Sequence, residues 1–469
     1  MGKIMAGYLF PHPPIIIDEI GKDERLAAIK TIEGTKKLAE DIKEKSPTTI
    51  IVVTPHGPLF RDAMAISVEK ELKGDFGDFG NSSVNFTFEN NLELVKEIIY
   101  RCSKENILIA KIDKKMAKSY HISHQLDHGT LVPLYFVNQE YNDYKLVHIT
   151  YGLLSPQDLF KFGNIVQEAV LKSDEDVVFI ASGDLSHRLS KEGPYAYSPY
   201  GRVFDEKLVE LLKAADFEGI LSFDLNLAEN AGQCALRSLM VMAGFLDGYK
   251  LESEILSYEG PFGVGYCNGK FTPVKRDETA KVYENLMRKE RERIEKIREN
   301  EDPYVRLARR SLEYYVKYNK KLEVPEDLDD EFINTRSGVF VSIKKDGMLR
   351  GCIGTIEPVR NNLAEEIIEN AISAGTRDPR FEPVSEEELP KLVYSVDVLK
   401  EPEPVSSIDE LDPKRYGVIV SKGFRRGLLL PNLEGVDTVE EQIKIALSKA
   451  GIREDEDYNI ERFEVIRHF

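Results

Sequence analysis

The sequence predicts an α/β protein of two domains, a larger N-terminal sheet with helices on both faces and a smaller C-terminal α+β domain. A chain of 469 residues is too long for one ordinary core. Its first half alternates short apolar runs with helical periodicity, which is typical of a sheet buried on both faces. Its last third instead carries paired β-like runs, and a highly charged segment lies between the two patterns.

The strands and helices of the N-terminal domain are predicted from the periodicity of apolar residues and from residue composition. Apolar, β-branched runs predict strands, and amphipathic stretches bounded by turn residues predict helices. The expected strands are 4–10, 48–54, 145–151 and 176–182, and the expected helices are 23–45 and 156–171. In open α/β sheets ligands bind beyond the carboxyl ends of the strands. A functional site is therefore expected there.

The segment 276–302 is dominated by Lys, Arg and Glu and predicts an exposed linker helix. It divides the chain into domains at 1–275 and 303–469. The second domain is expected to begin with a helix over 303–319. A β-hairpin should follow, turning at Asp346-Gly347. Further strands are expected at 392–399, in YGVIVS and in GLLLP, with a helix in TVEEQIKIALSKAGI.

Composition excludes several classes of protein. The formal net charge of −18 argues against a nucleic-acid surface, which needs clustered cations. No apolar run reaches the ~20 residues that span a bilayer, and the start lacks the features of a signal peptide. We therefore expect a cytoplasmic protein with no membrane partner. The four cysteines are widely spaced and form no C-x-x-C pair, which favours free thiols.

Histidines are concentrated in loops rich in Gly and Pro. The chain has only eight, and six of them fall in such loops: His12, His56, His121, His124, His128 and His187. Three of these (His12, His56 and His187) follow predicted strands within a few residues. Neutral imidazole is a good ligand for Fe, Zn, Cu or Mn. The pattern predicts an open metal site at the carboxyl ends of the strands.

Four segments, PHPP, TPHGP, LDHGTLVPL and SGDLSH, resemble in order and spacing the class III extradiol dioxygenases, a fold shared by the Memo proteins. The resemblance covers about residues 1–273. It implies that His12 and His56 bind Fe(II), and that His128, preceded by Asp127, and His187 transfer protons. Histidine suits either proton role near neutral pH.

The third metal ligand has more than one candidate. The family uses a carboxylate there, and Memo-like relatives use a cysteine, from the segment that here reads LAENAGQCALRSLMVMAGFLDG. Glu229 is favoured and Cys234 is the alternative, with Gln233 between them. A His–His–Cys set would suit Zn or Cu as well as iron. The protein would then be a metal-binding regulatory protein without ring-cleaving turnover.

Other residues near these motifs have two interpretations. His121 and His124 could tune the site or lie on the surface. The tyrosines of GPYAYSPYG (193–201) could line an aromatic pocket or serve packing alone.

The segments LRGCIGT (349–355) and AISAGTRDPRFEPV (371–384) resemble the AMMECR domain family, over about residues 303–469. Cys352 beside Arg350 is either a cation-stabilised, reactive thiolate or a buried small residue. Arg377, Asp378 and Arg380 either form a turn or complete a cleft with Cys352.

The two domains together resemble the AmmeMemoRadiSam system protein A family, which implies a Memo-type protein and a radical-SAM enzyme as partners. The predicted function is an Fe(II)-dependent oxidoreductase of the extradiol-dioxygenase type, acting on an aromatic diol or similar chelating small molecule. The alternatives are the metal-binding regulatory protein and a Cys352-dependent transferase or hydrolase.

Overall fold

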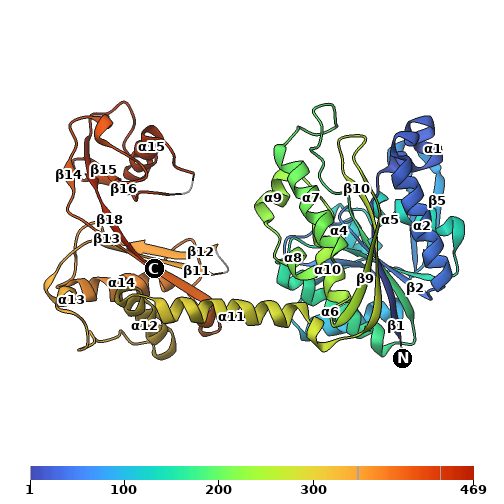
Figure 1. The fold of residues 1–469 in the computed structure, drawn as a ribbon, viewed down its shortest axis with the longest axis horizontal. Helices are drawn as coiled ribbons and strands as arrows, with labels where there is room; N and C mark the ends of the chain where they lie inside the picture. The colour runs from blue at the N-terminus through green and yellow to red at the C-terminus, as the bar shows by residue number, and fades with distance from the viewer. Residues whose placement is uncertain (1, 346–347, 434) are drawn as a thin grey trace. The chain divides into compact units, whose positions relative to one another are not determined.

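The computed structural model describes residues 2–345, 348–433 and 435–469, which form two compact units divided between Leu286 and Met287 (Figure 1). The expected hairpin turn at Asp346-Gly347 lies outside the described residues. Among the residues that are described, no helix is both long enough and apolar enough to cross a membrane.

The N-terminal unit is built on an eight-stranded sheet in the order β6-β3-β7-β2-β8-β1-β10-β9. Its centre, β7-β2-β8-β1, is parallel, and β10 and β9 add antiparallel strands at one edge. The four predicted strands are confirmed as β1, β2, β7 and β8. The strand bounds are β1 Lys3–Phe10, β2 Thr49–Thr54, β3 Met64–Ser67, β6 Ile109–Ile112, β7 Lys145–Thr150, β8 Asp176–Ser182, β9 Tyr249–Glu259 and β10 Tyr266–Arg276.

Helices cover both faces of this sheet, as expected from strands that are buried throughout (Figure 1). On one face, α2 (Ile29–Lys45) and α5 (His128–Glu140) enclose one apolar core. The other core lies beneath α3 (Leu92–Lys104), α6 (Pro156–Lys172) and α10 (Leu236–Phe245). The helix expected over 23–45 is divided, because Lys22–Ala28 forms 3₁₀ turns before α2 begins.

The remaining N-terminal elements are short or peripheral. A two-stranded hairpin, β4 (Glu71–Phe76) and β5 (Asn81–Glu89), lies outside the main sheet. The other helices are α1 Asp18–Gly21, α4 Lys114–Tyr120, α7 Pro199–Lys213, α8 Phe217–Leu221 and α9 Leu225–Ala231. A charged helix, α11 (Val282–Asn300), occupies most of the segment expected to be the linker.

The C-terminal unit holds two four-stranded sheets, in the orders β12-β11-β13-β18 and β14-β17-β15-β16. One face of the first sheet packs on α12 and α14 around a core that includes Leu312 and Ile367. The helix α15 packs on β15 and β16 of the second sheet. The bounds are α12 Pro303–Tyr318, α13 Asp330–Asn334, β11 Val339–Lys345, β12 Met348–Gly354, α14 Leu363–Thr376, β13 Leu392–Leu399, β14 Glu403–Pro404, β15 Gly417–Lys422, β16 Arg425–Leu429, α15 Val439–Ala450, β17 Asn459–Phe463 and β18 Val465–His468.

Candidate metal centre

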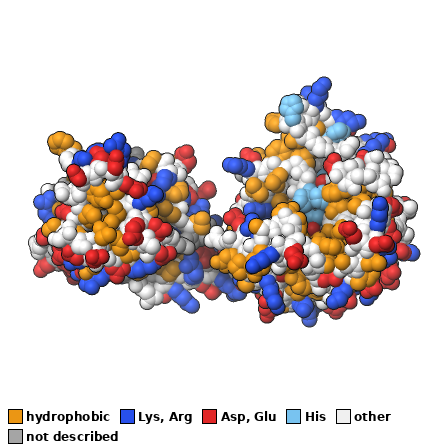
Figure 2. Space-filling view, turned by 90° about the horizontal axis from the view of Figure 1, so that it is seen from above, with side chains coloured by type: hydrophobic (Ala, Val, Ile, Leu, Met, Phe, Trp, Pro, Cys, Tyr) orange, Lys and Arg blue, Asp and Glu red, His pale blue; other side chains and the backbone are white. Residues whose placement is uncertain are grey.

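The carboxyl ends of three neighbouring parallel strands bring distant histidines to one place. β2, β8 and β1 are adjacent in the sheet, and His56, His187 and His12 follow them within a few residues. His128 is the first residue of α5, which packs over the same end of β2. The space-filling view onto this end shows histidine side chains in the middle of the unit's face (Figure 2).

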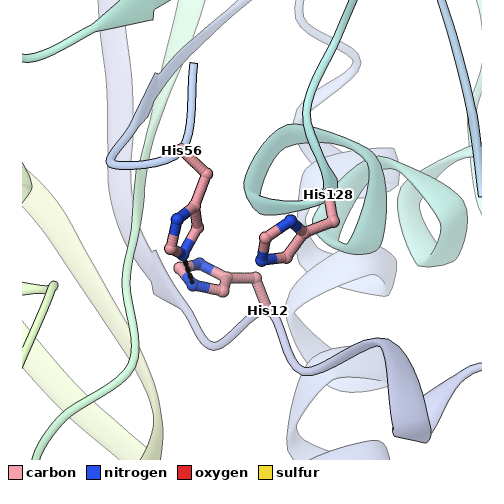
Figure 3. A group of neighbouring side chains, drawn as sticks. All are labelled: His12, His56 and His128. Atoms are coloured by element: carbon pink, nitrogen blue, oxygen red, sulfur yellow. Dashed lines mark hydrogen bonds between the residues drawn. The ribbon is translucent and has the colours of Figure 1, made fainter. Parts of the chain in front are cut away.

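Three of the histidines form a compact group (Figure 3). One nitrogen each of His12, His56 and His128 lies within 4.8 Å of the others. Nε2 of His56 is 3.0 Å from Nε2 of His12, and the His56 and His128 rings stack with centroids 4.3 Å apart. Three converging imidazole nitrogens are a donor set that fits a divalent transition metal.

The hydrogen bonds of Ser182 fix the tautomer of His12. The Ser182 hydroxyl donates its one proton to the Gly129 carbonyl oxygen, so toward His12 it can only accept. His12 Nδ1, 2.8 Å from Oγ, therefore carries the proton and donates it. The lone pair of His12 lies on Nε2, which faces His56. An outer hydrogen bond of this kind is typical of a metal-binding histidine.

The four predicted histidines are held in the neutral form. Burial lowers the pKa of His12 well below its usual value, and the nearby imidazoles lower it further. Burial and His128 lower the pKa of His56 to about 4. Burial likewise lowers the pKa values of His128 and His187. Neutral imidazoles can bind a metal or accept a proton.

Asp127 anchors the start of α5 from behind His128. Its carboxylate accepts hydrogen bonds from Thr54 Oγ1 at 2.5 Å and from His148 Nε2 at 3.1 Å. His148 Nδ1 in turn lies 2.8 Å from Ser67 Oγ. Burial raises the pKa of Asp127, but His148 and Thr54 outweigh burial and lower it to about 2. Asp127 is therefore ionised at neutral pH and favours a positive charge on His128. Sequence reasoning missed His148 because it lies inside β7.

Cys234 and Asp184 both contact His12. Cys234 Sγ is 3.6 Å from His12 Nε2. Zn–N bonds of 2.0–2.1 Å and a Zn–S bond of about 2.3 Å at a tetrahedral angle place the two ligand atoms about 3.6 Å apart. The backbone N–H of Asp184 donates to Cys234 Sγ, and its carboxylate accepts from the His12 backbone N–H at 2.9 Å. Asp184, in the SGDLSH segment, was not predicted.

The other candidates lie apart from this group. Glu229 is on α9 with an exposed side chain. Gln233 accepts a hydrogen bond at 2.8 Å from the backbone N–H of Leu236, the first residue of α10. His121 and His124 are exposed. Of the described residues, His12, His56 and His128 are those whose ligand atoms converge.

Aromatic side chains flank the histidines. Phe79, from the hairpin turn between β4 and β5, packs edge-on against His128 with centroids 5.1 Å apart. Tyr195 packs the same way on His187, also at 5.1 Å. Both rings are partly exposed. Tyr197 and Tyr200 of the same segment are also exposed.

In the C-terminal unit, Arg350 and Cys352 have different surroundings. The Arg350 guanidinium binds both carboxylate oxygens of Glu388 at 3.0 Å. Cys352 instead lies near Arg380, which donates to the Cys352 carbonyl oxygen at 3.3 Å. Burial raises the pKa of the Cys352 thiol, and the charge of Arg380 opposes that effect. Of these two arginines, the one that acts on the thiol is thus Arg380 and not the adjacent Arg350.

The comparisons with known proteins agree with both halves of this structure. Residues 6–268 match the family described as the catalytic LigB subunit of aromatic ring-opening dioxygenase, and residues 305–468 match AMMECR1. Protein CA_C1420 of Clostridium acetobutylicum is 49% identical over 98% of both chains. A Thermotoga maritima protein is 58% identical over 36% of this chain and 98% of its own.

Two solved structures are similar to parts of the chain. Protein PH0010 from Pyrococcus horikoshii is 37% identical, with a TM-score of 0.33, over 35% of this chain and 88% of its own. Protein JW3007 from Escherichia coli K12 is 13% identical, with a TM-score of 0.40, over 57% of this chain and 99% of its own. From the two family matches and the full-length relative, the chain belongs to the LigB family of ring-opening dioxygenase subunits, joined to an AMMECR1 domain.

Proposed function

We propose that the N-terminal unit is a metal-dependent oxidoreductase of the extradiol-dioxygenase type, with Fe(II) as its metal. Its substrate is an aromatic diol or a similar chelating small molecule. The observation that carries this proposal is the convergence of three imidazole nitrogens within 4.8 Å at the carboxyl ends of the parallel strands. Two of these imidazoles and one further protein ligand would hold the metal, which leaves coordination positions open for a substrate.

In this proposal His12 and His56 hold the metal through nitrogen, and Cys234 is the third ligand in preference to the exposed Glu229. The distance of Cys234 Sγ from His12 Nε2 supports this choice. The metal supplies Lewis-acid binding of the chelating oxygens and, as Fe(II), a route for electrons to dioxygen. A His–His–Cys set also accepts Zn or Cu.

His128 and His187 handle protons. Both are neutral, so each can accept a proton from a substrate hydroxyl and return it later. The ionised Asp127 stabilises the imidazolium that forms on His128. Phe79 and Tyr195 exclude water from one side of each imidazole and offer faces on which an aromatic ring can pack.

The test is anaerobic reconstitution with Fe(II), Zn(II) or Cu(II), followed by metal analysis and by oxygen uptake across a panel of catechols. We expect one metal per chain and oxygen uptake with iron alone. Variants His12→Ala and His56→Ala should lose the metal, and His187→Ala should keep it but lose turnover. His121→Ala, which changes an exposed histidine, is the matched control.

A second function is favoured by the thiol beside His12. In this second function the same His12, His56 and Cys234 set binds Zn or Cu without turnover, and the AMMECR1 domain docks a partner. Stoichiometric metal without oxygen uptake for any catechol would support this second function over the first. Metal loss in Cys234→Ser but not in Glu229→Gln would support Cys234 as the ligand under either function.

A further inference from the structure

A second group of polar side chains lies on the first sheet of the C-terminal unit. Val341 and Ile343 of β11 are buried in the core beneath α12 and α14. Successive residues of a strand face opposite sides, so Ser342 faces away from that core. Cys352 and Ser395 are its direct neighbours on β12 and β13. The sheet thus presents a thiol and two hydroxyls on its second face.

Cations from three separate elements lie within electrostatic range of the thiol. Arg467 comes from β18, Arg380 from the segment after α14, and Lys449 from α15 (Figure 1). Each of the three interacts electrostatically with Cys352. Arginine and lysine are the usual binding groups for carboxylates and phosphates.

Two of these cations are held by buried carboxylates. Arg467 binds both oxygens of Asp397, at 2.7 and 3.0 Å, and Arg380 binds both oxygens of Asp378, at 2.9 and 2.7 Å. Both aspartates are almost fully buried. For Lys449 the hydrogen bond found in the described chain is a long one, 3.4 Å, to a backbone carbonyl. The charges of these five groups, three cations and two carboxylates, sum to one positive charge.

The Cys352 thiol is uncharged at rest, so it does not cancel the net positive charge of the groups around it. The backbone of Cys352 is fixed at both ends, because its N–H donates to Asp378 at 2.9 Å and its carbonyl accepts from Arg380. Ser342 Oγ donates to the sulfur at 3.3 Å. Burial raises the pKa of Cys352, so the resting thiol is neutral. The residue is nevertheless partly exposed, which leaves it open to a small ligand.

We propose that this face binds a small oxyanion, the carboxylate or phosphate group of a ligand, against the Cys352 thiol. Lys449 and Arg380 attract the anion, and Arg467 adds positive charge from β18. The site belongs to the AMMECR1 domain and is independent of the metal centre proposed above.

Alkylation with two probes of similar size and different charge tests the proposal. Iodoacetate and iodoacetamide both react with the thiolate, the sulfur displacing iodide, so the ratio of their rates does not depend on the thiolate fraction. We expect the ratio at Cys352 in the full chain, read by peptide mass spectrometry, to exceed that of glutathione by about 3-fold or more. One unit charge a few ångströms away gives roughly that factor even at a water-like dielectric constant.

Variants and competing anions complete the test. Lys449→Gln should lower the ratio at least twofold, whereas Lys444→Gln, an exposed lysine on the same helix, should leave it unchanged. Millimolar phosphate or acetate, compared with chloride at equal ionic strength, should slow both reagents, and the stronger competitor identifies the kind of anion. A ratio at or below that of glutathione, equal ratios in the two variants, or no alkylation of Cys352 by either reagent would overturn the proposal.

Discussion

Replacing Ser182 with alanine should weaken metal binding, although this residue is not a ligand. Ser182 is fully buried between His12 Nδ1 and the Gly129 carbonyl oxygen. Without its hydroxyl, both groups lose a partner, and each buried unpaired group costs about 1–3 kcal/mol. His12 can avoid part of that cost by moving its proton to Nε2, but Nε2 then no longer offers a lone pair to a metal. Loss of such an outer partner typically lowers metal affinity about 10–100-fold.

Two measurements separate this effect from general destabilisation. Affinity for Zn(II) is measured by competition with a chromophoric chelator, and urea unfolding of the metal-free protein gives stability. Ser238→Ala is the matched control, because Ser238 is equally buried and donates to the Ser182 carbonyl oxygen at 2.9 Å without touching His12. It should lose about 1 kcal/mol of stability and keep its metal affinity. Unchanged affinity in Ser182→Ala, or equal losses in both variants, would refute the assigned tautomer.

Three further predictions concern stability. The hydrogen bonds of Arg350 lower the pKa of Glu388 to about 2, so this carboxylate stabilises the folded state fully above pH ~4.5 and loses its effect as the pH falls through about 2. Glu388→Gln should therefore destabilise the C-terminal unit at pH 6, by roughly 2 kcal/mol, and not at pH 2; urea unfolding at both values checks this. Gly183→Ala would place its Cβ 2.3 Å from the Cα of Ala235 and should disorder the site, seen as lost metal binding and a lower melting temperature. Leu312→Ala empties part of the C-terminal core and should cost about 2–5 kcal/mol, and a loss below 1 kcal/mol would contradict the packing described for α12.

Much of the fold could be predicted from the sequence because the central strands are almost wholly apolar. Runs such as TTIIVVT can be buried on both faces only inside an α/β sheet, and the histidine after such a run must lie at its carboxyl end. The position of His128 also followed from a motif, since it opens α5 directly. The boundary inside 23–45 was missed, because periodicity does not distinguish a 3₁₀ turn from the start of an α-helix.

The details of the site depend on side-chain directions that a sequence does not carry. Glu229 and Cys234 are five positions apart, but α9 ends between them at Gly232, whose φ of 65° reverses the chain. That turn leaves the carboxylate in solvent and places the thiol beside His12. His148 could not be predicted for a related reason. The role of a polar residue inside a strand depends on its hydrogen-bond partner, here Asp127, and the sequence does not identify that partner.

The tie between Cys234 and His12 spans 222 positions of the chain. A metal ion bound by both Cys234 and His12 would act as a removable cross-link between distant parts of the chain. It would close a very large loop of the unfolded polypeptide. By mass action the native state gains RT ln(1 + [metal]/Kd), about 2.7 kcal/mol at a hundredfold excess over Kd. The melting temperature of the N-terminal unit would therefore rise with the concentration of free metal. In a cell that is short of the ion, a larger fraction of the protein would be unfolded and open to degradation.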